Sequence, residues 1–297
     1  FTGSGTFTTI PNGTFDALVV DEAHRLNAKS GMFQNKGENQ IKEIIHAANC
    51  SVFFIDEDQR VHFKDIGTID EIKKWARKKN ANVTEMKLES QFRCNGSDGY
   101  LAWVDNTLQV RDTANETLHD IDYKFTVCES PTEMQERIFD LNKTNNKSRI
   151  VAGYCWKWEG KKDSTIKDIV IARYNFAAKW NLADDGNLWI VNQESVNEIG
   201  CIHTCQGLEL DYIGVIIGPD LVVRNGEVVT NGNERASSDA SIKGYKKLLK
   251  TSPEEAEAKA DMIIKNTYRT LMTRGQKGCF VFSTDPETNE YIQYSKG

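Results

Sequence analysis

Short apolar runs alternate with amphipathic segments in the first third of the chain. Residues 18–20 and 51–55 are apolar runs, and each is followed at once by polar residues. Between them, residues 38–48 place isoleucine and alanine side chains at helical spacing. Because a strand that is buried on both faces is apolar throughout, this alternation predicts two parallel strands, joined by a helix, in a helix-covered sheet.

The same pattern continues to about residue 108. We predict a basic helix over residues 70–79, a third strand over 82–88 and a further helix over 95–108. The basic residues of 70–79 indicate a solvated face, with a phosphate-contacting face as the alternative. A polar stretch then interrupts the pattern, and we place a domain boundary there, which gives domains at 1–118 and 119–297.

The second half begins a new series of strands and helices. Asn225-Gly226 between β-branched runs predicts a hairpin over residues 221–229. Ser252, Pro253 and Glu255 match a capping box at the start of the last long helix. Further strands are predicted at 123–128, 149–156, 186–191, 212–218 and 279–283, and helices at 131–141 and from 251 onward. The expected fold class is therefore α/β, with two parallel-sheet domains.

Composition limits the classes of protein to consider. The chain has 297 residues and a formal net charge of −6, so its surface as a whole does not attract nucleic acid. No apolar run approaches the roughly 18 residues of a membrane span. Seven scattered cysteines are typical of reduced thiols, and we expect a cytoplasmic protein. Because the chain starts at Phe1 rather than Met, we expect that a segment precedes it.

Two adjacent carboxylates, Asp21 and Glu22, follow the first predicted strand. The carboxyl end of a parallel strand is where α/β sheets bind ligands. Since side chains alternate along a strand, the two acids point in different directions. One can hold a hydrated Mg²⁺ while the other orients a water, as the hydrolysis of a nucleoside triphosphate requires. A solvated acidic turn is the alternative interpretation.

Two further groups of residues have candidate chemistry. Cys201, His203 and Cys205 lack the usual spacing of zinc ligands, and no second cluster completes the set. Trp156 and Trp158 flank a lysine, and aromatic residues interleaved with lysines can stack on bases and contact phosphates. Packing in the core is the alternative for the two tryptophans.

Five segments, in chain order, resemble the motifs of superfamily 1 helicase ATPases. They are Val19-Val-Asp-Glu-Ala-His24 for motif II, Phe54-Ile-Asp-Glu-Asp-Gln59 for motif III, Leu88-Glu-Ser-Gln-Phe-Arg93 for motif IV, Ile202-His-Thr-Cys-Gln-Gly-Leu-Glu209 for motif V and Leu271-Met-Thr-Arg-Gly275 for motif VI. Nearly the whole chain resembles the Schlafen group 3-like DNA/RNA helicase domain family, formerly domain of unknown function 2075. The segments most similar to this family begin at Asp21, Gln91, His203 and Tyr268.

The resemblance implies a P-loop NTPase (RecA-like) fold whose first domain is truncated at its N-terminus. It implies ATP and Mg²⁺ as cofactors and single-stranded DNA or RNA as a partner, with no membrane. By this resemblance the metal is held by Asp21, catalysis uses Glu22, Gln59, Arg93 and Arg274, the nucleotide meets Gln206, Gly207 and Glu209, and nucleic acid meets His203 and Thr204. The aromatic pair adds Trp156 and Trp158 as nucleic-acid candidates.

The sequence departs from the family pattern in two places. No Gly-Lys-Ser/Thr occurs in the chain, so the Walker A loop that should precede Asp21 is missing, and Gln206 stands where many helicases have lysine. Without that loop we expect this chain alone to bind ATP weakly and to hydrolyse little of it. The function implied is an ATP-dependent helicase or translocase. The alternative is a nucleotide-regulated binding, defence or signalling module that does not unwind nucleic acid.

Overall fold

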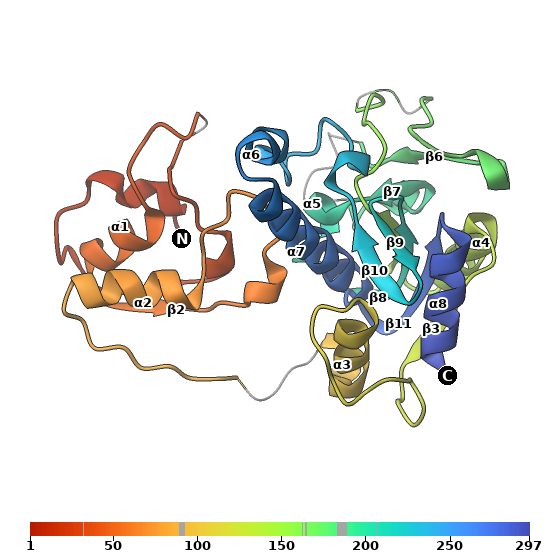
Figure 1. The fold of residues 1–297 in the computed structure, drawn as a ribbon, viewed down its shortest axis with the longest axis horizontal. Coiled ribbons are helices and arrows are strands. Elements are labelled where there is room, and N and C mark those ends of the chain that lie inside the picture. The colour runs from red at the N-terminus through yellow and green to blue at the C-terminus, as the bar shows by residue number, and fades with distance from the viewer. Residues whose placement is uncertain (32, 89–92, 162, 164, 183–188, 206) are drawn as a thin grey trace. The chain divides into compact units, whose positions relative to one another are not determined.

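The chain forms two compact units, residues Phe1–Leu88 and Glu89–Gly297, each described here by itself (Figure 1). The computed structural model describes the chain except residues 32, 89–92, 162, 164, 183–188 and 206, and describes residues 93 and 95 by their backbone alone. None of the described helices is long and apolar enough to cross a membrane. The α/β class predicted from the sequence is confirmed.

The first unit contains a parallel pair of strands and two helices. Its elements are β1 (Phe15–Val20), α1 (Gln40–Ala47), β2 (Ala48–Phe53) and α2 (Ile69–Lys78). Val20 of β1 pairs in register with Phe53 of β2, as expected for the predicted parallel strands. Asn39 caps α1 by accepting from the backbone N–H groups of Ile41 and Lys42, which satisfies two orphan donors at the helix start.

The prediction that the first strand is buried on both faces is wrong. Leu18, Val20 and Phe53 face the cluster formed by Ile41, Ile44 and their neighbours on α1. On the opposite face Val19 is 70% exposed and Val52 is 42% exposed. The strands are apolar on both sides, but among the described residues only one side is covered by helices.

The third strand predicted over residues 82–88 does not form. The stretch has no regular secondary structure and is exposed throughout, with Met86 90% and Leu88 77% exposed. A β-branched and apolar composition favours a strand only where a neighbouring strand satisfies its backbone groups. No described strand pairs with this stretch.

The second unit is built on a seven-stranded sheet with the strand order β3-β11-β8-β4-β7-β6-β5. Its neighbouring strands are parallel except for the antiparallel pair β5 and β6. The strands are β3 (Lys124–Val127), β4 (Ser148–Ala152), β5 (Ile169–Ile171), β6 (Phe176–Trp180), β7 (Glu198–Gly200), β8 (Leu210–Ile217) and β11 (Gly275–Ser283). The helices are α3 (Asp98–Thr107), α4 (Pro131–Asn142), α5 (Ile202–Cys205), α6 (Tyr245–Thr251), α7 (Pro253–Met272) and α8 (Pro286–Lys296).

Helix α3 belongs to this second unit, whereas the sequence analysis placed the domain division after residue 118. The ring of Tyr100 stacks on Tyr123 with centroids 3.8 Å apart, and Trp103 meets Phe125 edge to face at 4.6 Å. Trp103 also donates from its indole to the carbonyl of Ser295 at 2.9 Å. These aromatic contacts attach α3 to β3 and α8, so the compact units divide after Leu88 instead.

The predicted hairpin forms β9 (Leu221–Arg224) and β10 (Glu227–Thr230) around Asn225-Gly226. Both turn residues adopt left-handed φ angles, +53° and +81°, which is why an Asn-Gly pair suits this turn. The predicted strand over 149–156 ends earlier, at Ala152, and part of the one predicted over 186–191 lies outside the described residues.

The predicted capping box of α7 is wrong in one respect. Ser252 is the N-cap and Pro253 the first helical residue, but the Ser252 side chain makes no capping hydrogen bond. Ser252 also ends α6, and its backbone N–H donates to the carbonyl of Leu248 at 2.7 Å. A residue shared by two consecutive helices adopts a backbone that suits both, here φ −147° and ψ 78°.

The start of α8 depends on Asp285. Its carboxylate accepts from the backbone N–H of Thr288 at 3.0 Å and from the Arg224 guanidinium at 2.8 and 2.9 Å. Hydrogen bonding to Arg224 lowers the pKa of Asp285 to about 2, against the opposing effect of partial burial. We expect Asp285→Asn to lower the free energy of unfolding by about 1 kcal/mol at neutral pH. Urea denaturation at several pH values measures the difference.

The pH dependence of this difference follows from the lowered pKa. A carboxylate that is ionised more readily in the folded state stabilises it above the unfolded pKa of about 3.9. The effect of Asp285→Asn should therefore be constant above pH about 4 and shrink as the pH falls towards about 2. Asp140→Asn, at a side chain 74% exposed and paired with Lys143, is the control and should change little at any pH. A difference for Asp285→Asn that grows below pH 4 would contradict this account.

Candidate functional site

The polar residues that follow β1 and β2 share the carboxyl edge of the parallel pair. The backbone N–H of Phe54 donates to Val20 at 2.8 Å, and that of Ala23 donates back to Phe54 at 2.9 Å. These two hydrogen bonds extend the pairing beyond the strands. They tie the loop that carries Asp21 and Glu22 to the loop that leads to Gln59.

Asp21 and Glu22 differ in backbone conformation. Glu22 has a left-handed backbone with φ +51°, which is uncommon for a residue other than glycine and often occurs at functional sites. An oxygen of Asp21 accepts from the backbone N–H of Glu22 at 2.8 Å. Glu22 Oε2 lies 3.3 Å from Nε2 of His24, a buried side chain. The imidazole thus lies beside the Glu22 carboxylate, although neither of its ring nitrogens forms a hydrogen bond within the described part of the chain.

Gln59 lies in a 3-10 turn directly after β2 and is only 4% exposed. Its side-chain amide donates to Asp56 Oδ2 at 2.7 Å, and Asp56 Oδ1 accepts from the backbone N–H of Asp58 at 3.2 Å. Asp56 therefore fixes the orientation of the Gln59 amide. This arrangement suits a side chain that senses the terminal phosphate of a nucleotide. It also suits a side chain that only satisfies polar groups at the end of β2.

The residues at this edge fit a magnesium ion that is held mainly by its substrate. Asp21 is an exposed carboxylate, and oxygen is the ligand atom that Mg²⁺ prefers. The described residues contain no group of three or more His, Cys, Asp or Glu side chains that could hold a metal. Mg²⁺ commonly binds through one or two carboxylates, waters and substrate phosphates, so an exposed carboxylate such as Asp21 suits this mode of binding.

In the second unit, Arg274 occupies the turn between α7 and β11. Its side chain is 5% exposed, and its backbone carbonyl accepts from Leu210 of β8 at 3.1 Å. Burial raises the pKa of the neighbouring Cys205 thiol to about 12, although the charge of Arg274 acts in the opposite direction. Cys205 is therefore a neutral thiol, which disfavours it as a metal ligand.

Arg93 begins a 3-10 turn, Arg93–Gly96, that lies in the second unit and not in the first as the sequence analysis assigned it. The thiol of Cys94 donates to the carbonyl of Thr273 at 3.6 Å. Cys94 follows Arg93 and Thr273 precedes Arg274, so this contact brings the backbone of the two arginines near each other. Arg93 and Arg274, the two arginines assigned to catalysis from the sequence, belong to one compact unit.

The predicted nucleic-acid residues His203 and Thr204 lie on the short helix α5. Thr204 donates from its hydroxyl to Asn181 at 2.8 Å, and His203 Nε2 lies 3.5 Å from Asp239. Gly207 and Glu209, predicted to approach the nucleotide, are exposed, and Gly207 has φ +87°. Gln206 lies outside the described residues.

Trp156 and Trp158 are half-buried against the hydrophobic cluster of the second unit. Trp156 donates from its indole to the carbonyl of Val170 at 3.2 Å, and Trp180 donates to the carbonyl of Trp156 at 3.2 Å. Lys161 Nζ lies 5.3 Å from the ring of Trp158. Packing, the alternative given from the sequence, accounts for most of the Trp156 contacts, and base stacking stays a prediction.

A buried ionic cluster that the sequence analysis missed connects α5 to α7. Arg235 is fully buried and donates to Asp239 Oδ2 at 2.6 Å and to Asp220 Oδ2 at 3.1 Å. The hydroxyl of Tyr268, on α7, donates to the other oxygen of Asp220. Ser241 completes the set by accepting from Arg235 at 3.0 Å. We call Asp220, Arg235, Asp239 and Tyr268 the Arg235 cluster.

The charges of the Arg235 cluster depend on one another. Burial lowers the pKa of Arg235, but the charges of Asp239 and Asp220 outweigh this effect and raise the pKa above its usual value. Burial likewise opposes ionisation of Asp239, yet Arg235, with hydrogen bonds from His203 and Ser241, holds its pKa well below the usual value. The only sequence signal was Asp220 at the end of an apolar strand. Arg235 and Asp239 are four positions apart, but Asp220 lies 15 positions from Arg235 and 48 from the tyrosine of the cluster, so these contacts form only on folding.

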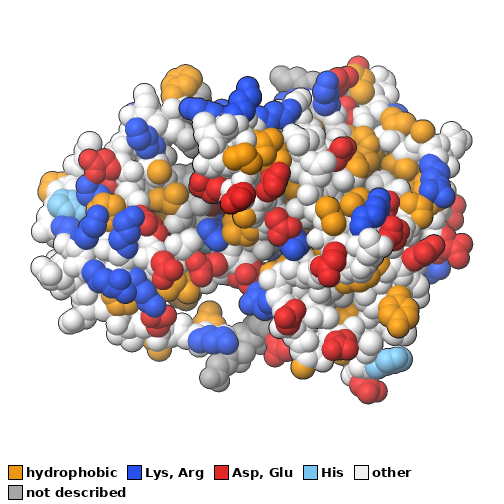
Figure 2. Space-filling model, viewed as in Figure 1, with side chains coloured by type: hydrophobic (Ala, Val, Ile, Leu, Met, Phe, Trp, Pro, Cys, Tyr) orange, Lys and Arg blue, Asp and Glu red, His pale blue; other side chains and the backbone are white. Residues whose placement is uncertain are grey.

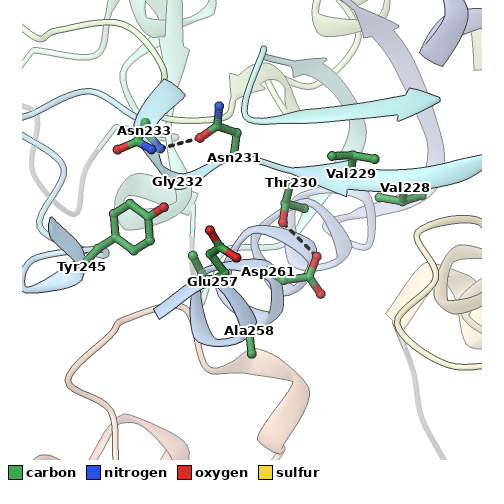
Figure 3. Close-up of a pocket in the computed structure, with 11 residues that line it drawn as sticks. Val228, Val229, Thr230, Asn231, Gly232, Asn233, Tyr245, Glu257, Ala258 and Asp261 are labelled. Carbon is green, nitrogen blue, oxygen red and sulfur yellow. Dashed lines mark hydrogen bonds between the residues drawn. The ribbon is translucent and has the colours of Figure 1, made fainter. Parts of the chain in front are cut away.

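A pocket of about 600 Å³ in the second unit lies apart from the predicted site residues. Figure 3 shows Tyr245, Glu257 and Asp261 around it, and Thr230 donates from its hydroxyl to Asp261 at 2.8 Å. The remaining lining comes from β10, the loop after it and α7: Val228, Val229, Asn231, Gly232, Asn233, Ala258 and Ala260. None of the residues predicted from the sequence lines this pocket.

Comparison with known proteins agrees with this architecture. The chain is 24% identical over 303 residues to the uncharacterized protein YPL245W of Saccharomyces cerevisiae, an alignment that covers 93% of this chain and 64% of that protein. Residues 1–285 match the sequence model described as "Schlafen group 3, DNA/RNA helicase domain". A helicase-like function related to nucleic acid is thereby indicated. The chain belongs to the Schlafen group 3 DNA/RNA helicase domain family.

Proposed function

We propose that this chain is part of an ATP-dependent helicase or translocase that acts on single-stranded nucleic acid. The observation that carries the proposal is the shared carboxyl edge of β1 and β2. Two hydrogen bonds, Phe54 to Val20 and Ala23 to Phe54, hold the Asp21–Glu22 loop and the Gln59 loop together. Parallel α/β sheets bind nucleotides at this edge.

Each residue at the edge has a distinct proposed role. Asp21 holds Mg²⁺, which when bound neutralises charge on the phosphates. Glu22, whose carboxylate lies 3.3 Å from the buried imidazole of His24, accepts a proton from the attacking water. Gln59, oriented by Asp56, senses the terminal phosphate. The left-handed backbone of Glu22 supports a functional role for this residue, because such conformations cluster at functional sites.

The second unit supplies the remaining roles. Arg93 and Arg274 are proposed to stabilise the charge that develops on the phosphoryl oxygens. Gly207 and Glu209, together with Gln206, approach the nucleotide. His203 and Thr204 contact the nucleic acid, and Trp158, beside Lys161, is the better placed of the two tryptophans to stack on a base because its ring already carries a lysine on one side.

The proposal is tested by measuring ATP hydrolysis with and without a single-stranded oligonucleotide, using the protein as its gene encodes it. We expect turnover that the oligonucleotide stimulates. Glu22→Gln should lower the rate by about 10²-fold or more, since it removes the proton acceptor and keeps the shape of the side chain.

Glu38→Gln is the matched control for Glu22→Gln. Glu38 is 73% exposed at the start of α1 and pairs with Lys42, so its loss should leave hydrolysis unchanged. If Glu22→Gln and Glu38→Gln hydrolyse ATP equally well, Glu22 is not the proton acceptor. The absence of any turnover in the wild-type protein, with or without DNA or RNA, would refute the enzymatic proposal.

The net charge of −6 favours a second candidate, a nucleotide-regulated binding module that does not unwind nucleic acid. ATP hydrolysis that no oligonucleotide stimulates, together with ATP-dependent binding to another protein, would select this candidate. If the protein still separates the strands of a duplex at moderate salt, the second candidate is excluded. An acidic surface alone holds nucleic acid weakly under these conditions.

A further inference from the structure

Helix α6 and the residue pair before it form the most cationic short segment of the second unit. Residues 243–250 contain four lysines and no acidic residue, in a chain whose formal net charge is −6. The four are Lys243, Lys246, Lys247 and Lys250, and all are exposed. Figure 2 shows Lys and Arg side chains gathered along the edge where Figure 1 labels α6.

These lysines do not pair with the acids that lie near them in the chain. Among the described residues, none of their ammonium groups forms an ion pair, whereas Lys143 pairs with Asp140 at 2.6 Å and Lys277 with Asp211 at 2.6 Å. Glu254, Glu255 and Glu257 follow within a few positions on α7, yet no ion pair joins them to α6. The helix dipole accounts for a cation in the last turn, at Lys250, but not for the other three.

Buried contacts fix α6 in place and leave the lysines facing solvent. Tyr245 is 3% exposed and packs against Gly232, where an added Cβ would lie 2.9 Å from the tyrosine ring. Leu248 and Leu249 are half-buried. Figure 3 shows Tyr245 on the inner side of this region, towards Gly232. Lys246, Lys247 and Lys250 are therefore displayed from a fixed helix, and Lys243 lies in the turn that precedes it.

Asp239 connects the loop that leads into α6 to His203. One oxygen of Asp239 lies 3.5 Å from His203 Nε2 and also accepts from the backbone N–H of Ser241 at 2.9 Å. The backbone N–H of Lys243 then donates to Ala240 at 3.3 Å. The loop is anchored by the buried Arg235, so the first lysine follows four residues after a side chain that contacts His203.

We propose that Lys243, Lys246, Lys247 and Lys250 form a phosphate-binding strip for single-stranded nucleic acid that continues from His203. This proposal rests on the proposed function, because it assumes that His203 contacts the same nucleic-acid strand as the lysines. Lysines act as point charges for phosphates, and a row of them tracks a nucleic-acid backbone without reading its sequence. The strip supplies the local positive charge that the acidic surface as a whole lacks.

The test measures the affinity of the chain for a fluorescently labelled oligothymidylate by anisotropy at several salt concentrations. The double variant Lys246→Gln with Lys250→Gln removes two neighbours on one face of α6. We expect weaker binding by several-fold. The slope of log affinity against log salt should be smaller by roughly 0.7 for each phosphate that the variant no longer neutralises.

A second double variant, Lys143→Gln with Lys147→Gln, is the matched control. It makes the same change of net charge at two exposed lysines at the end of α4 and just before β4, and it should keep the wild-type slope. If both double variants bind alike, only net charge matters and the strip is refuted. Binding of the wild-type chain to anionic phospholipid vesicles, but not to the oligonucleotide, would refute it as well.

ATP hydrolysis separates this proposal from the proposed function. The α6 variant should keep the rate measured without oligonucleotide and need a higher oligonucleotide concentration for half-maximal stimulation. If no form of the protein hydrolyses ATP, the ATPase proposal fails while the anisotropy result still decides whether the strip binds nucleic acid.

Discussion

Replacing Arg274 by alanine is expected to lower the rate of ATP hydrolysis by about 10³- to 10⁵-fold, the range found for arginines that stabilise a phosphoryl-transfer transition state. The side chain is 5% exposed in the turn after α7, where its backbone carbonyl is held by Leu210. Because the side chain is buried, water is largely excluded from it, which strengthens its interaction with charge that develops on the phosphate. Phosphate release at saturating ATP measures the effect.

Two further variants separate a catalytic role of Arg274 from a structural one. Arg274→Lys keeps a cation but loses the planar fork of donors, so the rate should stay well below that of the wild-type protein. Arg137→Lys, at an exposed arginine paired with Glu133 on α4, is the control and should leave the rate unchanged. Thermal unfolding is followed in parallel. Normal hydrolysis by a folded Arg274→Ala variant would remove this arginine from the mechanism.

Replacing Arg235 by methionine is expected to lower the free energy of unfolding by about 3–5 kcal/mol. The substitution leaves Asp220 and Asp239 buried without their shared cation, and removing one partner of a buried ion pair costs far more than removing an exposed pair. Denaturation by urea, followed by circular dichroism, gives the free energy of unfolding for each variant.

Arg224→Met is the matched control for Arg235→Met. Arg224 also holds a carboxylate with two hydrogen bonds, at Asp285, but its own side chain is 47% exposed. Water can replace it, so its loss should cost much less stability. If Arg235→Met were no less stable than Arg224→Met, the Arg235 cluster would not be holding α5, α7 and the loop before α6 together.

The elements that were predicted correctly from the sequence depend on local signals. The hairpin follows from Asn225-Gly226, whose left-handed conformations are intrinsic to those residues. The helices around residues 40–47 and 253–272 follow from apolar spacing within one segment. The order of the helicase-like motifs is likewise a property of the chain itself.

The errors arose where a distant partner decides the outcome. The composition of residues 82–88 suits a strand, but no described strand pairs with them. Arg93 lies within the predicted first domain, 1–118, whereas the compact unit that contains its turn begins at Glu89, and Cys94 of that turn contacts Thr273. Periodicity within a segment carries no information about which remote segment will lie beside it.

The sequence by itself determined the α/β class, the placement of acids after two parallel strands, the hairpin and the family to which the chain belongs. Only the tertiary structure decided that Val19 lies on an uncovered face, that Arg235 is enclosed by two aspartates and that the α6 lysines follow a loop held beside His203. The physical reason is the distance along the chain between the residues that interact. Turn conformation and side-chain alternation are set by neighbours in sequence, whereas burial and ion pairing are set by contacts that exist only once the chain has folded.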